Sequence, residues 1–141
     1  MIPVYQEHDH DCMRACLASI LEIDPKHLPA PHPAEMTPEE WNDIYWKALV
    51  PFNYWLVGVN GWLDIDPPGY YVGVWRCRFL NDTGKRVYPK HAVVMKGDMI
   101  VHDPIKPDLK TACSFTYLKK MALSMLVPID PALHVKKRVT R

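Results

Sequence analysis

Apolar residues near the start of the chain recur with the spacing of an α-helix. Asp11 precedes them and is placed to accept backbone N–H bonds from the first helical turn. The pair Asp24-Pro25 follows them and is predicted to end the helix. The apolar positions lie three and four residues apart, which puts them on one helical face; they are Met13, Cys16, Leu17, Ile20 and Leu21.

A second helix is predicted to begin within the sequence TPEE. Thr37 can cap it, Pro38 suits the first helical position, and Glu40 completes a capping box with Thr37. An apolar stripe follows at helical spacing and stops before Pro51.

From residue 54 onward the pattern changes to short runs rich in aromatic and β-branched residues, which is typical of strands. The segment 115–126 fits a strand or a helix equally well. Two leading helices followed by antiparallel strands predict an α+β fold with the first helix packed on the sheet. The predicted strands cover residues 54–59, 70–79, 87–95 and 99–103.

The length and composition of the chain fit one compact domain. It has 141 residues, 48% of them hydrophobic, which is enough for a core of its own. We expect this domain to span residues 1–135 and to be followed by a solvated basic tail at 136–141. The connection at 25–33 is rich in proline and is predicted to be extended.

Charge and hydropathy argue against two classes of partner. A formal charge of +1 provides no broad basic surface for nucleic acid. No run approaches the roughly 18 uncharged apolar residues of a membrane span, and residues 1–20 lack the apolar core of a signal peptide. We therefore expect no nucleic-acid or membrane partner, and interpret the four cysteines as reduced thiols in a cytoplasmic protein.

Cys12 stands where a helix favours a negative charge. If Asp11 is the cap, Cys12 occupies the first turn, whose unpaired N–H groups and dipole stabilise an anion. A thiol in that position loses its proton more easily and becomes nucleophilic. By contrast, Cys16 and Cys77 lie among apolar residues and are interpreted as core, and Cys113 has no informative context.

The sequence HAVVMKGDMIVHDP, residues 91–104, predicts a β-hairpin that brings a histidine to a carboxylate. If Gly97 is the centre of a three-residue loop, His91 pairs directly with Asp103. Their Cβ atoms would then lie about 5 Å apart. A carboxylate so placed accepts a ring N–H, selects the tautomer and supports a positive charge on the imidazole. A register shifted by one residue would remove this direct pairing.

Gln6 adds a possible donor ahead of the first helix. Its side-chain amide and the backbone N–H of Cys12 would together point two donors at the oxyanion of a tetrahedral intermediate.

These two stretches resemble the papain-like cysteine peptidases, most closely the bacteriocin-processing peptidases of the C39 type. Those enzymes carry a glutamine six residues before a cysteine, and later a histidine that opens an apolar strand and an Asp-Pro after a hairpin. The later motif reads HAVV from His91 and VHDP ending at Asp103-Pro104. The earlier motif is carried by Gln6, Asp11, Cys12, Ala15, Cys16 and Leu17.

The resemblance implies a papain-like fold and a thiol peptidase or related amide hydrolase that needs no cofactor or metal and acts on a peptide or protein substrate. It implies Cys12 as the nucleophile, His91 as general base and acid, and Asp103 as the residue that orients the imidazole. Gln6 would be the oxyanion donor. The family usually has glycine after the cysteine, whereas this chain has Met13; a side chain there would change the cleft or the activity.

Three other interpretations fit the same residues. A thioacyl intermediate resolved by an amine makes the protein an acyltransferase of the transglutaminase type. A papain-like domain that has lost activity would bind peptides without cleaving them. A zinc site is the third, because three alternating residues point to one side of an extended backbone and a fourth could join them; these are His8, His10, Cys12 and His102.

Overall fold

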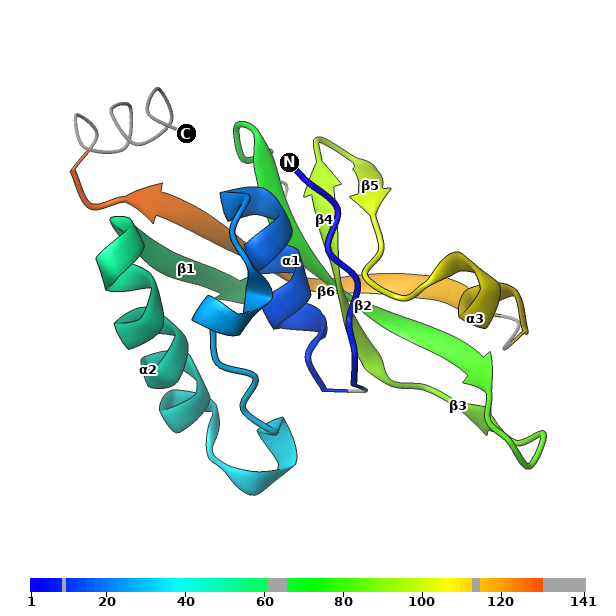
Figure 1. Ribbon diagram of the computed structural model, residues 1–141. Helices are drawn as coiled ribbons and strands as arrows, with labels where there is room; N and C mark the ends of the chain where they lie inside the picture. The colour runs from blue at the N-terminus through cyan, green and yellow to red at the C-terminus, as the bar shows by residue number, and fades with distance from the viewer. Residues whose placement is uncertain (9, 61–65, 113–114, 131–141) are drawn as a thin grey trace.

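The computed structural model describes residues 1–8, 10–60, 66–112 and 115–130 (Figure 1). Within these residues the fold is α+β, as predicted, with helices followed by an antiparallel sheet. The helices are α1 (Cys12–Leu21), α2 (Pro38–Leu49) and α3 (Pro107–Ala112), with single 3-10 turns at η1 (Pro25–His27), η2 (Pro33–Glu35) and η3 (Val50–Phe52). The strands are β1 (Tyr54–Asn60), β2 (Tyr70–Leu80), β3 (Arg86–Val87), β4 (Lys90–Lys96), β5 (Met99–His102) and β6 (Thr116–Pro128).

The strands form one sheet in the order β1-β6-β2-β4-β5, with β3 paired to the far end of β2. All the pairs are antiparallel. The segment that fits helix and strand equally well from its sequence is β6, and it lies in the middle of the sheet between β1 and β2. The last of the described strands therefore joins β1 to the rest of the sheet.

Helices α1 and α2 cover one face of the sheet, with α1 in front of β2 and β4 (Figure 1). Along α1 the predicted apolar face is buried except at Ile20, which is partly buried, because the face packs against alternate residues of these strands. Each fully buried side chain of this kind contributes about 1.5 to 3 kcal/mol. The shared core contains Met13, Cys16, Leu17, Tyr45, Leu49, Leu56, Val72 and Val94.

The ends of the two long helices follow from local sequence. At α2 the predicted capping box is confirmed, because the Thr37 side chain accepts from the Glu40 N–H and the Glu40 carboxylate accepts from the Thr37 N–H. The predicted end of α1 at Asp24-Pro25 is too late. The helix ends at Leu21, since Glu22 adopts a left-handed conformation with φ of 58°.

The β4–β5 hairpin has a different turn from the predicted one. The strands are joined by two residues, Gly97 and Asp98, and Lys96 pairs with Met99. Gly97 has a φ of +59°, so the expected left-handed glycine is confirmed. An irregularity beyond Met95 then shifts the register again, and β5 ends at His102.

No helix in the described ranges is long and apolar enough to cross a membrane. The predicted basic tail and Cys113 lie outside the described residues.

Candidate active site

Cys12 is the first residue of α1, as predicted, but Asp11 does not cap that helix with its side chain. The Asp11 carboxylate turns back instead. It accepts the backbone N–H groups of Glu7 and His8, each at 3.1 Å, and the Arg14 guanidinium at 3.0 Å. The prediction of a side-chain cap is therefore wrong, because these three donors already occupy the carboxylate. The first-turn N–H groups of α1 are left available to an anion.

Asp11 is almost completely buried, with 1% of its surface exposed. Burial by itself would raise the pKa of this carboxyl, but the hydrogen bonds from Glu7, His8 and Arg14 outweigh it and hold the pKa below its usual value. The charged carboxylate thus fixes the loop that leads into Cys12.

His91 opens β4 and meets Asp103 just after the end of β5. The His91 Nε2 lies 2.8 Å from Asp103 Oδ1, and the two side chains are only 6% and 7% exposed. The predicted contact is confirmed, but the predicted register is wrong. His91 pairs with Trp75 of β2, and the nearest β4–β5 pair is Val94 with His102. Asp103 reaches the imidazole from the loop beyond the strand.

The Cys12 side chain lies close enough to the His91 imidazole to raise the pKa of that ring. Since Nε2 faces Asp103, the other ring nitrogen, Nδ1, is the one that remains for the thiol. Cys12 is a free cysteine at a half-buried position. A thiol at the start of α1 is thus brought to an imidazole and a carboxylate from one distant hairpin.

The environment of His91 favours its charged form. Burial lowers the pKa of the imidazole, but the hydrogen bonds to Asp103 and Cys12 outweigh burial and raise the pKa to about 9. For Asp103, burial acts to raise the pKa, and the hydrogen bonds from His91, Tyr117 and the Ile105 backbone hold it below the usual value. At neutral pH the imidazolium and the carboxylate are both charged.

Tyr117 of β6 is a member of this site that the sequence did not reveal. Its hydroxyl donates a hydrogen bond to Asp103 Oδ2. The Ile105 N–H donates to Oδ1 at 2.8 Å, so both carboxylate oxygens are held. Burial and the neighbouring Asp103 raise the pKa of Tyr117 well above its usual value, which keeps the hydroxyl a donor.

An aromatic side chain next to Tyr117 covers the imidazole. The Phe115 ring meets the His91 ring edge-on at 5.5 Å between centroids, and it also contacts the Tyr117 ring at 5.3 Å. An aromatic neighbour limits the access of water to the His91–Asp103 pair. In the sequence, only the pattern F-x-Y at residues 115–117 could have indicated these two side chains, and this pattern is not specific for such a site.

Gln6 is tied to the same loop as Asp103, because its backbone N–H donates to Pro104 O at 2.8 Å. Its side-chain Nε2 donates to His8 O at 2.9 Å, and a primary amide keeps a second N–H for another acceptor. The Oε1 atom is buried and has no partner within the described part of the chain. Buried polar atoms are nearly always paired in folded proteins, so this one is unusual.

Two of the other cysteines are core residues, as interpreted from the sequence. Cys16 and Cys77 are fully buried. Burial raises the pKa of the Cys16 thiol well above its usual range, which makes it a poor nucleophile.

The structure does not assemble the residues of the alternative zinc site. Cys12 begins a helix, so the extended backbone on which that interpretation depends is absent at this residue. His102 Nε2 lies 2.7 Å from Val4 O, in the N-terminal segment. His8 and His10 stack on each other with ring centroids 5.8 Å apart. Among the described residues there is no group of three His, Cys, Asp or Glu side chains that could hold a metal ion.

Comparison of the chain with protein-family models, with curated proteins and with solved structures finds no match. The interpretation of the site therefore depends on its own geometry and chemistry.

Proposed function

We propose that this protein is a papain-like cysteine peptidase or a related amide hydrolase. The observation that carries the proposal is the contact line from Cys12 through His91 to Asp103. It joins a thiol at a helix start to an imidazole whose other nitrogen is held by a buried carboxylate. This arrangement supplies a nucleophile, an acid–base group and the residue that orients it.

The first half of the reaction forms a thioester. The Cys12 thiolate attacks the carbonyl carbon of the scissile amide, and the carbonyl oxygen becomes an oxyanion. When the carbon–nitrogen bond breaks, the His91 imidazolium gives its Nδ1 proton to the leaving amine. The acyl group remains on Cys12, and the charge of Asp103 stabilises the imidazolium before this transfer.

In the second half, water resolves the thioester. The neutral His91 takes a proton from the water as its oxygen attacks the acyl carbon, and the carbon–sulfur bond breaks to restore the thiolate. The Cys12 N–H, in a helix start without a side-chain cap, and the remaining N–H of Gln6 are the donors proposed for the oxyanion.

The position of Met13 supports an active enzyme over an inactive peptide-binding domain. Met13 replaces the glycine that the resembling family usually has. Its side chain is 5% exposed and packs in the core with Leu17 and Leu21. A side chain directed into the core does not narrow the surface beside Cys12.

The first test is the reactivity of the thiol. We expect iodoacetamide to alkylate Cys12 at pH 7 at least about tenfold faster in the wild-type protein than in His91→Ala, because the imidazolium stabilises the thiolate. Peptide mass mapping assigns the modified cysteine, and the buried Cys16 serves as the internal control. Equal rates in the two proteins would contradict the proposed pair.

The second test is turnover. We expect Cys12→Ala and His91→Ala to lower cleavage of a defined peptide library by about 10³-fold or more, while circular dichroism stays that of the folded protein. Asp103→Asn should lower it less, since its role is to orient the imidazole. Adding an amine acceptor to the same assay separates hydrolysis from acyl transfer, and retained turnover in Cys12→Ala would refute the mechanism.

A further inference from the structure

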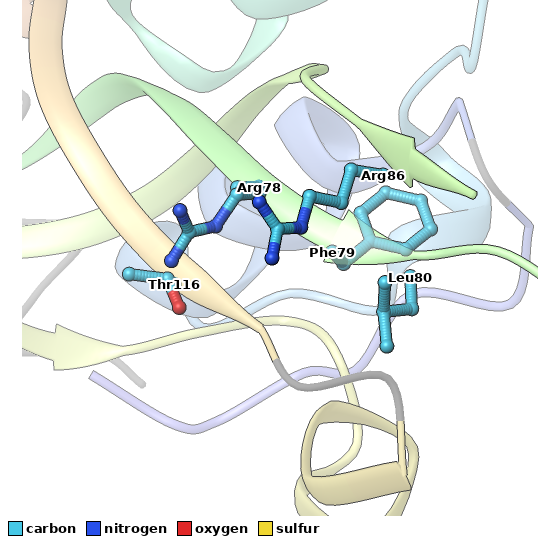
Figure 2. Close-up of a pocket in the computed structure, with 5 residues that line it drawn as sticks. All are labelled: Arg78, Phe79, Leu80, Arg86 and Thr116. Carbon is cyan, nitrogen blue, oxygen red and sulfur yellow. The ribbon is translucent and has the colours of Figure 1, made fainter. Parts of the chain in front are cut away.

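A pocket of about 290 Å³ lies at the end of the sheet where β2, β3 and β6 meet. Figure 2 shows Arg78 from β2 and Arg86 from β3 directed across it, with the Thr116 side chain from β6 at its edge. Phe79 and Leu80 complete the lining. The pocket thus combines two guanidinium groups and a hydroxyl with apolar walls.

The positive charges of the two arginines are available to a ligand. Within the described part of the chain, the ion pairs join other residues, and neither Arg78 nor Arg86 takes part in one. A guanidinium presents its donors in a planar fork that matches a carboxylate. Two such forks around one pocket, in a chain with a formal charge of only +1, form a local anion site.

Three basic residues also lie opposite one another on β2, β4 and β6. Arg76 lies directly opposite Lys90 on β4 and opposite Lys119 on β6. Like charges placed opposite each other destabilise a sheet.

The pocket is connected to the proposed active site by two aromatic rings. Phe79, which lines the pocket, stacks on Phe115 at 6.1 Å between centroids, and Phe115 meets His91 at 5.5 Å. The leaving amine must lie against His91, because that imidazole gives it a proton. A group bound in the pocket is therefore on the leaving side of the scissile bond.

We infer that the Arg78–Arg86 pocket binds a carboxylate on the leaving side of the substrate. This inference rests on the proposed function and names the substrate class, a peptide with an acidic side chain or a free carboxyl end after the cleaved bond. The carboxylate accepts from the two guanidinium groups, and the Thr116 hydroxyl is available as a further donor.

A binding experiment tests this without any turnover. The full-length Cys12→Ala protein is titrated with three tripeptides while the arginine side-chain signals are followed by NMR. Ala-Ala-Glu amide carries a side-chain carboxylate, Ala-Ala-Ala with a free end carries a main-chain one, and Ala-Ala-Gln amide carries neither. We expect at least one acidic peptide to shift the Arg78 and Arg86 signals and to bind at least tenfold more tightly than the Gln peptide.

Variants show whether the pocket is responsible. Arg78→Gln and Arg86→Gln should each weaken binding of the acidic peptide at least tenfold. Arg78→Lys should recover only part of the lost affinity, because lysine keeps the positive charge but lacks the planar guanidinium fork. Lys47→Gln is the matched control, since it removes one cation from α2 at the opposite end of the molecule (Figure 1). Equal binding of the Gln and acidic peptides, or no effect of the arginine variants, would overturn the inference.

Inorganic phosphate is the competing ligand in the same titration. If phosphate binds more tightly than both acidic peptides, the pocket is a phosphate site and the carboxylate assignment is wrong. Because every measurement uses Cys12→Ala, failure of the peptidase proposal would show as absent turnover in the wild type, separately from these binding results.

Discussion

At the scale of single residues, the carboxylate of Asp103 is fixed by more hydrogen bonds than the imidazole of His91, which it orients. It accepts from His91 and the Ile105 N–H on one oxygen and from Tyr117 on the other. The sequence suggested Cys12, His91, Asp103 and Gln6, since motif spacing marks them. It could not suggest Tyr117, because nothing in the chain before β6 indicates which strand lies beside Asp103.

Tyr117→Phe tests this support for Asp103. Without the hydroxyl, one carboxylate oxygen loses its donor, and the pair with His91 is less well oriented. We expect the pKa of Asp103 to rise, because the Tyr117 hydrogen bond that lowers it is lost, and the free energy of unfolding to fall by about 1 to 2 kcal/mol.

An NMR titration of the Asp103 carboxyl carbon measures the first effect, and urea unfolding measures the second. Tyr88→Phe is the control, since Tyr88 is 50% exposed and should change neither quantity. An unchanged Asp103 titration in Tyr117→Phe would show that the hydroxyl has only a packing role.

At the scale of elements, the hairpin shows what local sequence can and cannot predict. The KGD sequence correctly indicates a turn with a left-handed glycine at Gly97. It does not reveal the irregularity between Val94 and Met95, because a bulge depends on neighbouring strands as well as on its own residues. His91 and Asp103 still meet, because Asp103 lies beyond the strand and is not bound by its register.

Gly97→Ala tests the turn. An added Cβ would meet nothing within 4 Å, so the cost is conformational rather than steric. We expect the free energy of unfolding to fall by about 1 kcal/mol, because a residue with a side chain is strained at a φ of +59°. Urea unfolding measures this loss of stability. Gly58→Ala is the control, because its Cβ would make an ordinary contact with Ser124 at 3.9 Å. A loss in Gly58→Ala as large as that in Gly97→Ala would argue against this explanation.

At the scale of the whole molecule, the order of the strands could not be predicted from sequence patterns. The capping box of α2, the positions of the earlier strands and the fold class follow from local spacing, whereas the pairing of β6 with both β1 and β2 depends on contacts between distant segments. This pairing places Tyr117 and Phe115 beside residues from β4 and from the loop after β5.

The stability of the whole molecule should depend on pH through His91. Its pKa is raised from 6.5 to about 9 on folding, so the folded state binds the proton more tightly than the unfolded state. The resulting stabilisation is complete below about pH 6.5 and is lost as the pH rises through 9. A shift of this size corresponds to about 3 kcal/mol.

Urea unfolding of the wild type and of His91→Gln between pH 6 and 10 checks this dependence. We expect the free energy of unfolding to decrease across this range in both proteins and less steeply in His91→Gln, whose remaining slope comes from buried groups with raised pKa values such as Cys16. A wild-type curve that rises with pH would contradict the assigned sign.

The hydrogen bond from the Gln6 N–H to Pro104 O has one more consequence. Together with the bond between His102 and Val4, it clamps the opening segment of the chain to both sides of Asp103. The segment from Val4 to Gln6 is therefore positioned when the protein folds, and a ligand that binds beside it would not have to order this segment.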